Sequence, residues 1–160
     1  MESEPAIPGT FKTDKLISWT ELEHDNAAKN RGTAQYCTKF TMNDLSADEY
    51  QLDLGDVRES ARVYLNGKEV TTLFAVPFKT KIGEFLKQGE NLLEVEVTNL
   101  PANSISDFDK RGVEWRIFNE INFVDLNYRK TLYDKWETSP SGLLGDRKST
   151  RLNSSHIPIS

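Results

Sequence analysis

The stretch that decides the fold class spans residues 52–70 and reads LDLGDVRESARVYLNGKEV. Its second half alternates, and the apolar side chains on one face are Ala61, Val63 and Leu65. The dipeptide Asn66-Gly67 follows directly. Asn-Gly between alternating runs predicts a two-residue hairpin turn, because a type I′ turn needs positive φ at both central positions. The stretch therefore predicts two antiparallel strands joined by a tight turn.

The same period of two recurs on both sides of this stretch. Within residues 34–42 the apolar face holds Ala34, Tyr36, Phe40 and Met42, and the polar face holds Gln35, Cys37, Lys39 and Thr41. Three further runs alternate in the same way, with apolar positions at Tyr50, Leu52, Leu54, Phe78, Ile82, Leu93, Val95 and Val97. Pro77 indicates an edge, a bulge or a change of sheet, and a last strand is expected within residues 121–126. Short strands, turn signals and no long amphipathic helix predict an all-β fold, an antiparallel β-sandwich of the jelly-roll kind.

Composition narrows the function classes. At 160 residues and 37% hydrophobic content the chain has the size and character of one globular domain. A net charge of −5 argues against a nucleic-acid partner and against an anionic membrane surface. No apolar run is long enough to span a membrane.

Histidine and cysteine are scarce. The single cysteine, Cys37, excludes an internal disulfide and a multi-thiolate metal site, and we expect it to pack against a neighbouring segment. With only His24 and His156, Ser-His-Asp catalysis and histidine-rich metal sites are not expected.

The two ends differ in character from the middle. Residues 1–12 are expected to be a disordered or inter-domain lead-in, and residues 1–10 lack the basic and apolar parts of a signal peptide. Residues 13–145 form the predicted sandwich, with residues 13–22 as a leading strand or a wrap over its edge and Trp19 as a packing residue. Residues 146–160, DRKSTRLNSSHIPIS, have no period and resemble the translation of a common sequencing adapter. We therefore expect a non-native tail there.

The candidate binding segment spans residues 99–115, a long connection that we expect to be a loop. The candidate carbohydrate-binding residues are Asn103, Asp107, Asp109, Arg111 and Trp115. Acids and amides suit sugar hydroxyls, and a tryptophan face can stack on a pyranose ring. Three alternatives stand beside this hypothesis. The acids and Arg111 pair with each other while Trp115 packs in the sandwich, the acids bind calcium through oxygen ligands, or the segment docks against another domain.

No catalytic residue is assigned. Glycoside hydrolysis needs two carboxylates about 5–10 Å apart across the bond. Two pairs of acids lie close together in the sequence, Asp107 with Asp109 and Glu114 with Glu120. Closeness in the sequence does not place two carboxylates across a bond, and all four residues are explained as ordinary acids on solvated loops. Two further groups of residues are interpreted as structural. An aromatic group is expected to take part in core or inter-domain packing and consists of Trp136, Tyr133 and Tyr128. Arg58 and Glu59 are expected to form an ion pair in a loop.

Several of these stretches carry a family resemblance. Residues 52–70 and GEFLKQGENLLEVEVTN, residues 83–99, resemble the sugar-binding sandwich of family 2 glycoside hydrolases. Downstream, TNLPANSISDFDKRGVEW (98–115), EINFVDLNY (120–128) and PSGLLG (140–145) look like the C-terminal galactose-binding-like domain of glycoside hydrolase family 106. Members of that family are α-L-rhamnosidases.

The resemblance implies an accessory domain of a glycosidase. Its catalytic carboxylates would lie on a separate barrel domain of the same parent chain, so this chain alone is expected to be inactive and to need no cofactor. Calcium-assisted sugar binding in some members is implied for the parent only. A plant or microbial polysaccharide is the implied carbohydrate partner, and the parent is expected to be periplasmic or secreted. Two alternatives remain, an autonomous carbohydrate-binding module and a structural sandwich without a ligand.

Overall fold

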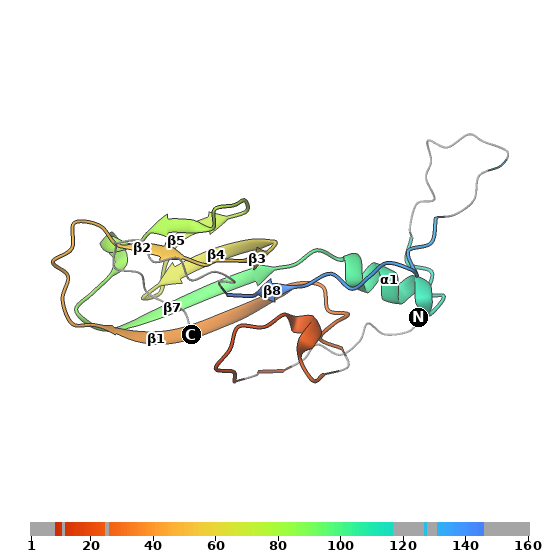
Figure 1. Cartoon of the computed structure of the whole chain (residues 1–160), viewed down its shortest axis with the longest axis horizontal. Helices are drawn as coiled ribbons and strands as arrows, with labels where there is room; N and C mark the ends of the chain where they lie inside the picture. The colour runs from red at the N-terminus through yellow and green to blue at the C-terminus, as the bar shows by residue number, and fades with distance from the viewer. Residues whose placement is uncertain (1–8, 11, 25, 117–126, 128–130, 146–160) are drawn as a thin grey trace.

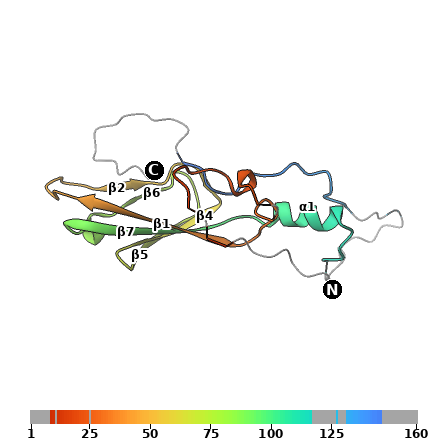
Figure 2. The ribbon, with the colours of Figure 1, turned by 90° about the horizontal axis from the view of Figure 1, so that it is seen from below.

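The structure is a computed structural model that describes residues 9–10, 12–24, 26–116, 127 and 131–145. One layer is a four-stranded antiparallel sheet (Figure 1). Its strands in spatial order are β1 (Thr33–Met42), β7 (Gly89–Thr98), β4 (Ser60–Leu65) and β5 (Lys68–Leu73). The opposite layer consists of two short ladders, β2 (Gln51–Asp53) with β6 (Lys79–Lys81) and β3 (Val57–Arg58) with β8 (Gly142–Leu143). Figure 2 shows β2 and β6 as a layer beside the larger sheet, so the predicted all-β antiparallel sandwich is confirmed.

Alternating side chains explain why the central strands pair in this register. The neighbours Ala61 and Val97, Val63 and Val95, and Leu65 and Leu93 lie opposite one another, and all six are at most 2% exposed. Every second residue of a strand points to the same face, so this register delivers all six side chains to one side. Burying a Val or Leu side chain contributes about 2 kcal/mol, and this face is therefore the main attachment of the sheet to the second layer.

The predicted hairpin turn is confirmed. Asn66 has φ 53° and Gly67 has φ 78°, the positive values that a type I′ turn requires. The Asn66 side chain adds a second function, because its Nδ2 donates to the Phe85 carbonyl and its Oδ1 accepts from the Leu92 amide. The turn between β4 and β5 is thereby tied to the start of β7 and to the short 3-10 helix η2 (Gly83–Phe85).

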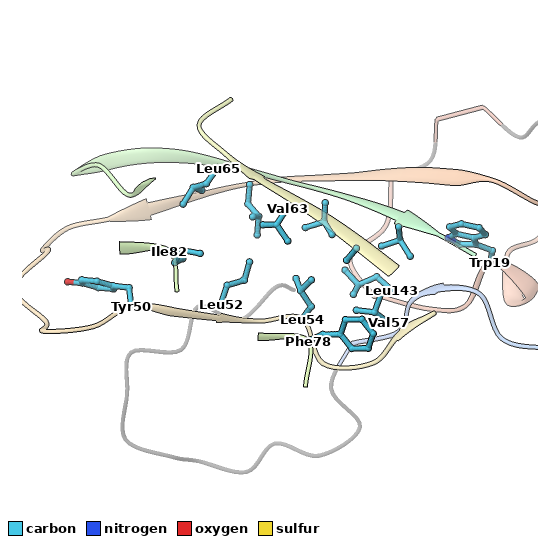
Figure 3. Close-up of a cluster of buried hydrophobic side chains, with 14 residues drawn as sticks. Trp19, Tyr50, Leu52, Leu54, Val57, Val63, Leu65, Phe78, Ile82 and Leu143 are labelled. Carbon is cyan, nitrogen blue, oxygen red and sulfur yellow. The ribbon is translucent and has the colours of Figure 1, made fainter. Parts of the chain in front are cut away.

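The core lies between the two layers. Figure 3 shows Leu52 and Leu54 of the smaller layer facing Val63 and Leu65 of the four-stranded sheet. Trp19 closes one end of this cluster; it is 6% exposed, and its Nε1 donates to the Tyr36 hydroxyl at 2.7 Å. The predicted packing role of Trp19 is therefore confirmed, although residues 13–22 contribute the 3-10 helix η1 (Trp19–Glu21) and no strand.

The connection after β7 was wrongly predicted to be a loop. It contains helix α1 (Ala102–Lys110), which projects beyond the end of the strands (Figures 1 and 2). Its residues ANSISDFDK include Asn, Ser and Asp, which have low intrinsic helix propensity. Tertiary contacts of its buried face stabilise it instead, and residues 99–116 give no apolar stripe from which those contacts could be read.

Other local expectations had mixed outcomes. Pro77 marks a change of sheet, since β5 belongs to the larger layer and β6 to the smaller one. Cys37 was wrongly expected to be packed; it is exposed on the outer face of β1 opposite Glu94. Arg58 pairs with Asp56 at 2.7 Å, two residues before it, in place of the predicted pair with Glu59. The expected strand within 121–126, and Tyr128, lie outside the described residues. In the part of the chain that the structure describes, no helix has the length and apolar character needed to cross a membrane.

Candidate functional site

A buried asparagine, Asn99, fixes the chain where it leaves β7 toward helix α1. Asn99 follows the last residue of β7 and is 8% exposed. Its Oδ1 accepts from the Gly32 amide, and its Nδ2 donates to the Asn30 carbonyl and to Ser141 Oγ. Because Gly32 immediately precedes β1 and Ser141 immediately precedes β8, this side chain joins three segments distant in sequence where the helix leaves the sandwich.

Three of the predicted residues form a stripe along one side of helix α1. Asn103, Asp107 and Arg111 are spaced four residues apart, which places them one above another on an α-helix. Asn103 exchanges two hydrogen bonds of 2.8 Å with the backbone of Ser139. Asp107 accepts from Arg111 Nε at 2.8 Å and lies 3.2 Å from Lys29 Nζ. The stripe therefore contacts both the segment before β1 and the segment before β8.

The other two predicted residues form a second cluster on a different side of the helix. Asp109, whose side chain is 3% exposed, accepts from Trp115 Nε1 at 2.7 Å and from the Tyr133 amide at 2.8 Å. Arg116 Nη2 lies 3.4 Å from the same carboxylate and donates to the Thr131 carbonyl at 2.6 Å. Asp109 is thus the centre of a partly buried network that fastens residues 131–133 to the helix.

Aromatic rings enclose the Arg116 guanidinium. Its Cζ lies 4.4 Å from the ring centroid of Trp115 and 5.4 Å from that of Tyr133, within cation–π range. The Tyr133 ring in turn contacts Trp136, with centroids 4.4 Å apart. Trp136 keeps 48% of its surface exposed, so the ring at the end of this cluster is accessible from outside.

The structure brings the five predicted residues to one helix and the turn that follows it, but divides them into two groups. The acid–arginine pairing stated as an alternative is present between Asp107 and Arg111. Sequence reasoning missed Lys29, Arg116 and Ser139 as members of these groups. Lys29 lies 78 positions before Asp107 and no local pattern connects them. Arg116 stands directly after Trp115, and its position beside that tryptophan was the one available signal.

The acids of helix α1 are poorly placed for acid–base catalysis. Residues i and i+2 of an α-helix are separated by about 200° around its axis, so Asp107 and Asp109 point to opposite sides and cannot face one bond. Each carboxylate also lies against a cation. Glu120, the partner proposed for Glu114, lies outside the described residues.

The acids of helix α1 are engaged by other groups of the same domain. Calcium takes six to eight oxygen ligands. Within the described ranges, no group of three or more His, Cys, Asp or Glu side chains is arranged to hold a metal ion. The carboxylate oxygens of Asp107 and Asp109 form ion pairs and hydrogen bonds with Lys29, Arg111, Trp115 and the Tyr133 backbone.

A family match covers helix α1 and all strands of the sandwich before β8. Residues 11–140 match the model of the glycosyl hydrolase 2 galactose-binding domain-like family. The chain belongs to this family. The membership agrees with the all-β sandwich, and it makes the chain a domain of the kind found in glycoside hydrolases.

Individual relatives are all much longer than this chain. A putative beta-glucuronidase of Formosa agariphila is 34% identical over 154 residues, which is 84% of this chain and 13% of the relative. Among solved structures, a rhamnosidase from Novosphingobium sp. PP1Y is 25% identical with a TM-score of 0.69, over 90% of this chain and 13% of that one. A beta-glucuronidase of an uncultured Clostridium sp. is 27% identical with a TM-score of 0.50, over 61% of this chain and 18% of that one. The chain thus spans less than a fifth of the length of each.

Proposed function

We propose that this sandwich is a non-catalytic accessory domain of a larger α-L-rhamnosidase-like glycoside hydrolase, as the family 106 resemblance implies. In this proposal it supports a catalytic barrel carried elsewhere in the parent chain. The observation that carries the proposal is that the candidate site residues form their hydrogen bonds and ion pairs within their own domain. The polar atoms of Asn103, Asp107 and Asp109 bind other parts of the same domain, so they act as structural connectors.

The rhamnosidase assignment is favoured by the extent of structural likeness. The Novosphingobium rhamnosidase matches 90% of the chain, whereas the Clostridium beta-glucuronidase matches 61%. The putative beta-glucuronidase of Formosa supports a second candidate, a parent that acts on β-glucuronides. Both candidates keep the same role for this domain.

Exposed apolar side chains supply the contact that a supporting domain needs. Phe74 and Val76, in the connection from β5 to β6, are each 81% exposed. Single exposed apolar side chains are common on protein surfaces, but Phe74 and Val76 stand two positions apart on one connection. In the proposal they pack against the remainder of the parent chain.

Carbohydrate binding by the isolated domain is the second proposed function. The half-exposed ring of Trp136 favours it, since a sugar ring can stack there beside Tyr133, whose cluster contains the candidate residue Trp115. Calorimetry with rhamnose-containing pectic fragments distinguishes the two. We expect no heat of binding from the 160-residue chain, and saturable binding that Trp136→Ala abolishes would replace the accessory role with that of a binding module.

Two assays test the enzyme context. We expect no release of nitrophenol from p-nitrophenyl α-L-rhamnoside or p-nitrophenyl β-D-glucuronide by this chain alone. We also expect the genomic reading frame that contains residues 1–145 to encode a barrel domain. Hydrolysis by the chain, or a complete frame without a barrel, would overturn the proposal.

A further inference from the structure

The turn between β4 and β5 combines a reactive sequence with a firmly held side chain. Asparagine is a thermolabile residue, and Asn66-Gly67 is the one Asn-Gly dipeptide of the chain. Because glycine has no Cβ, nothing shields the backbone nitrogen of Gly67 from the side-chain carbonyl carbon of Asn66. Attack of that nitrogen on that carbon is the first step of asparagine deamidation. The sequence of the turn therefore favours this reaction.

The folded domain engages the whole Asn66 side chain. Its Nδ2 donates to the Phe85 carbonyl at 2.9 Å and to Asn91 Oδ1 at 2.8 Å, and its Oδ1 accepts from the Leu92 amide at 3.1 Å. A primary amide has two N–H donors, so both of them are used. The Asn66 backbone amide also donates to the Leu92 carbonyl at 2.9 Å. These hydrogen bonds must break before the amide carbon can turn toward the Gly67 nitrogen.

The reaction that the fold holds back needs only water and base. The Gly67 amide gives its proton to hydroxide, and its nitrogen forms a bond to Cγ of Asn66. The bond from Cγ to Nδ2 breaks, and Nδ2 takes a proton from water and leaves as ammonia. Water then opens the succinimide ring at either carbonyl carbon, which leaves aspartate or isoaspartate at position 66. The net change is the exchange of an amide and water for an acid and ammonia, without oxidation or reduction.

Neither product fits the place of the amide. In aspartate an oxygen takes the position of Nδ2 and faces two other acceptors, the Phe85 carbonyl and Asn91 Oδ1. Acceptors cannot hydrogen-bond to one another, and an unpaired group in a partly buried place destabilises the fold. Isoaspartate lengthens the backbone of a two-residue turn whose central residues must both adopt positive φ. The native contacts of the turn are therefore lost with either product.

We propose that Asn66 is a latent deamidation site. The hydrogen bonds of the native turn keep the side chain unreactive, opening of the turn exposes it to attack, and the product prevents the turn from closing as before. Local opening of this kind occurs in native proteins while the rest of the structure stays folded. The modification is therefore an irreversible record of opening at this end of the sandwich, and it is independent of the enzyme to which the domain belongs.

Peptide mapping by mass spectrometry measures deamidation at Asn66 in the 160-residue chain at pH 8. The reference is a synthetic peptide of residues 62–71, RVYLNGKEVT, which lacks the partners from η2 and β7. We expect the folded chain to react about tenfold or more slowly than the peptide, and the chain unfolded in urea to react at the peptide's rate. Equal rates for the folded chain and the peptide, or no acceleration in urea, would overturn the inference.

Two substitutions separate opening of the turn from general destabilisation. Asn91→Ala removes an acceptor of Asn66 Nδ2 near the start of β7, whereas Asp109→Asn removes an ion pair beyond the other end of that strand. Deamidation at Asn66 should be faster in Asn91→Ala than in Asp109→Asn by about fivefold or more. Both are compared at a temperature at which circular dichroism shows them folded. Equal acceleration in the two folded variants would contradict the protective function of the local hydrogen bonds.

Asn66→Asp tests the effect of the product on the fold. Its thermal unfolding midpoint should lie about 5 °C or more below that of the unsubstituted chain. Asn43→Asp makes the same chemical change at an exposed residue after β1 and should leave the midpoint unchanged. Equal midpoints for the two variants would show that an aspartate fits the turn, and the proposed irreversible step would then be wrong.

Discussion

The indole of Trp115 is hydrogen-bonded to the carboxylate of Asp109, from Nε1 to Oδ1 at 2.7 Å. The same carboxylate also receives the Tyr133 amide and lies beside Arg116, whose side chain is 8% exposed. Two residues expected to contact sugar are therefore bound to each other. Their contact attaches Trp115 to helix α1, and the Tyr133 amide attaches residues 131–133 to the same carboxylate.

Asp109→Asn should destabilise the domain by about 3 kcal/mol, because it leaves the Arg116 cation buried beside a neutral partner. Urea unfolding followed by tryptophan fluorescence measures the change. Asp48→Asn, at an exposed acid, is the control, and its free energy of unfolding should stay within about 0.5 kcal/mol of that of the unsubstituted chain. A loss no larger than that of the control would show that Asp109 has no structural function.

Gly142→Ala should cost more than about 3 kcal/mol, since it introduces a clash as well as backbone strain. Gly142 has φ 99°, and a Cβ there would lie 2.6 Å from the Tyr36 hydroxyl and closer still to Trp19 Nε1. Gly112→Ala separates the two effects: Gly112 has φ 68° but no atom within 4 Å of the added Cβ. That variant should lose only about 1 kcal/mol. Equal losses in thermal unfolding would contradict the clash.

Asn91→Ala should destabilise the sandwich by about 3 kcal/mol, because it leaves buried backbone groups without their hydrogen-bond partners. Asn91 is fully buried, accepts from the Lys87 amide and from Asn66 Nδ2, and donates to the Lys87 and Gly89 carbonyls. Chemical denaturation provides the measurement. Asn43→Ala, on the exposed residue after β1, should be nearly neutral, and similar effects of the two substitutions would refute the network's contribution.

Cys37 should react with iodoacetamide more slowly than free cysteine at pH 8. Partial burial, and secondly the carboxylate of Glu94, raise the pKa of its thiol, so less of the reactive thiolate is present. Glu94→Gln removes the like charge, lowers the pKa and should increase the rate by about twofold. Glu96→Gln, two residues along the same strand, should leave the rate unchanged. A reaction rate that Glu94→Gln leaves unchanged would contradict the electrostatic contribution.

Most of the sheet was predictable because its determinants are local. The alternation at Ala61, Val63 and Leu65 predicted which side chains are buried, and Asn66-Gly67 predicted the turn. Both follow from the two-residue period of a strand and from the positive φ that a type I′ turn requires. Helix α1 was not predictable in this way, since its buried residues are mostly polar.

By itself, the sequence determined which side chains of each alternating strand lie on its apolar face, and it supplied the residues by which the family is recognised. The tertiary structure alone decided what the candidate site residues do. Lys29 meets Asp107 across 78 positions and Tyr133 meets Asp109 across 24, so those carboxylates bind their own domain. Such pairings depend on where the chain folds back on itself, and the residues involved follow no periodic pattern in the sequence from which the pairings could be predicted.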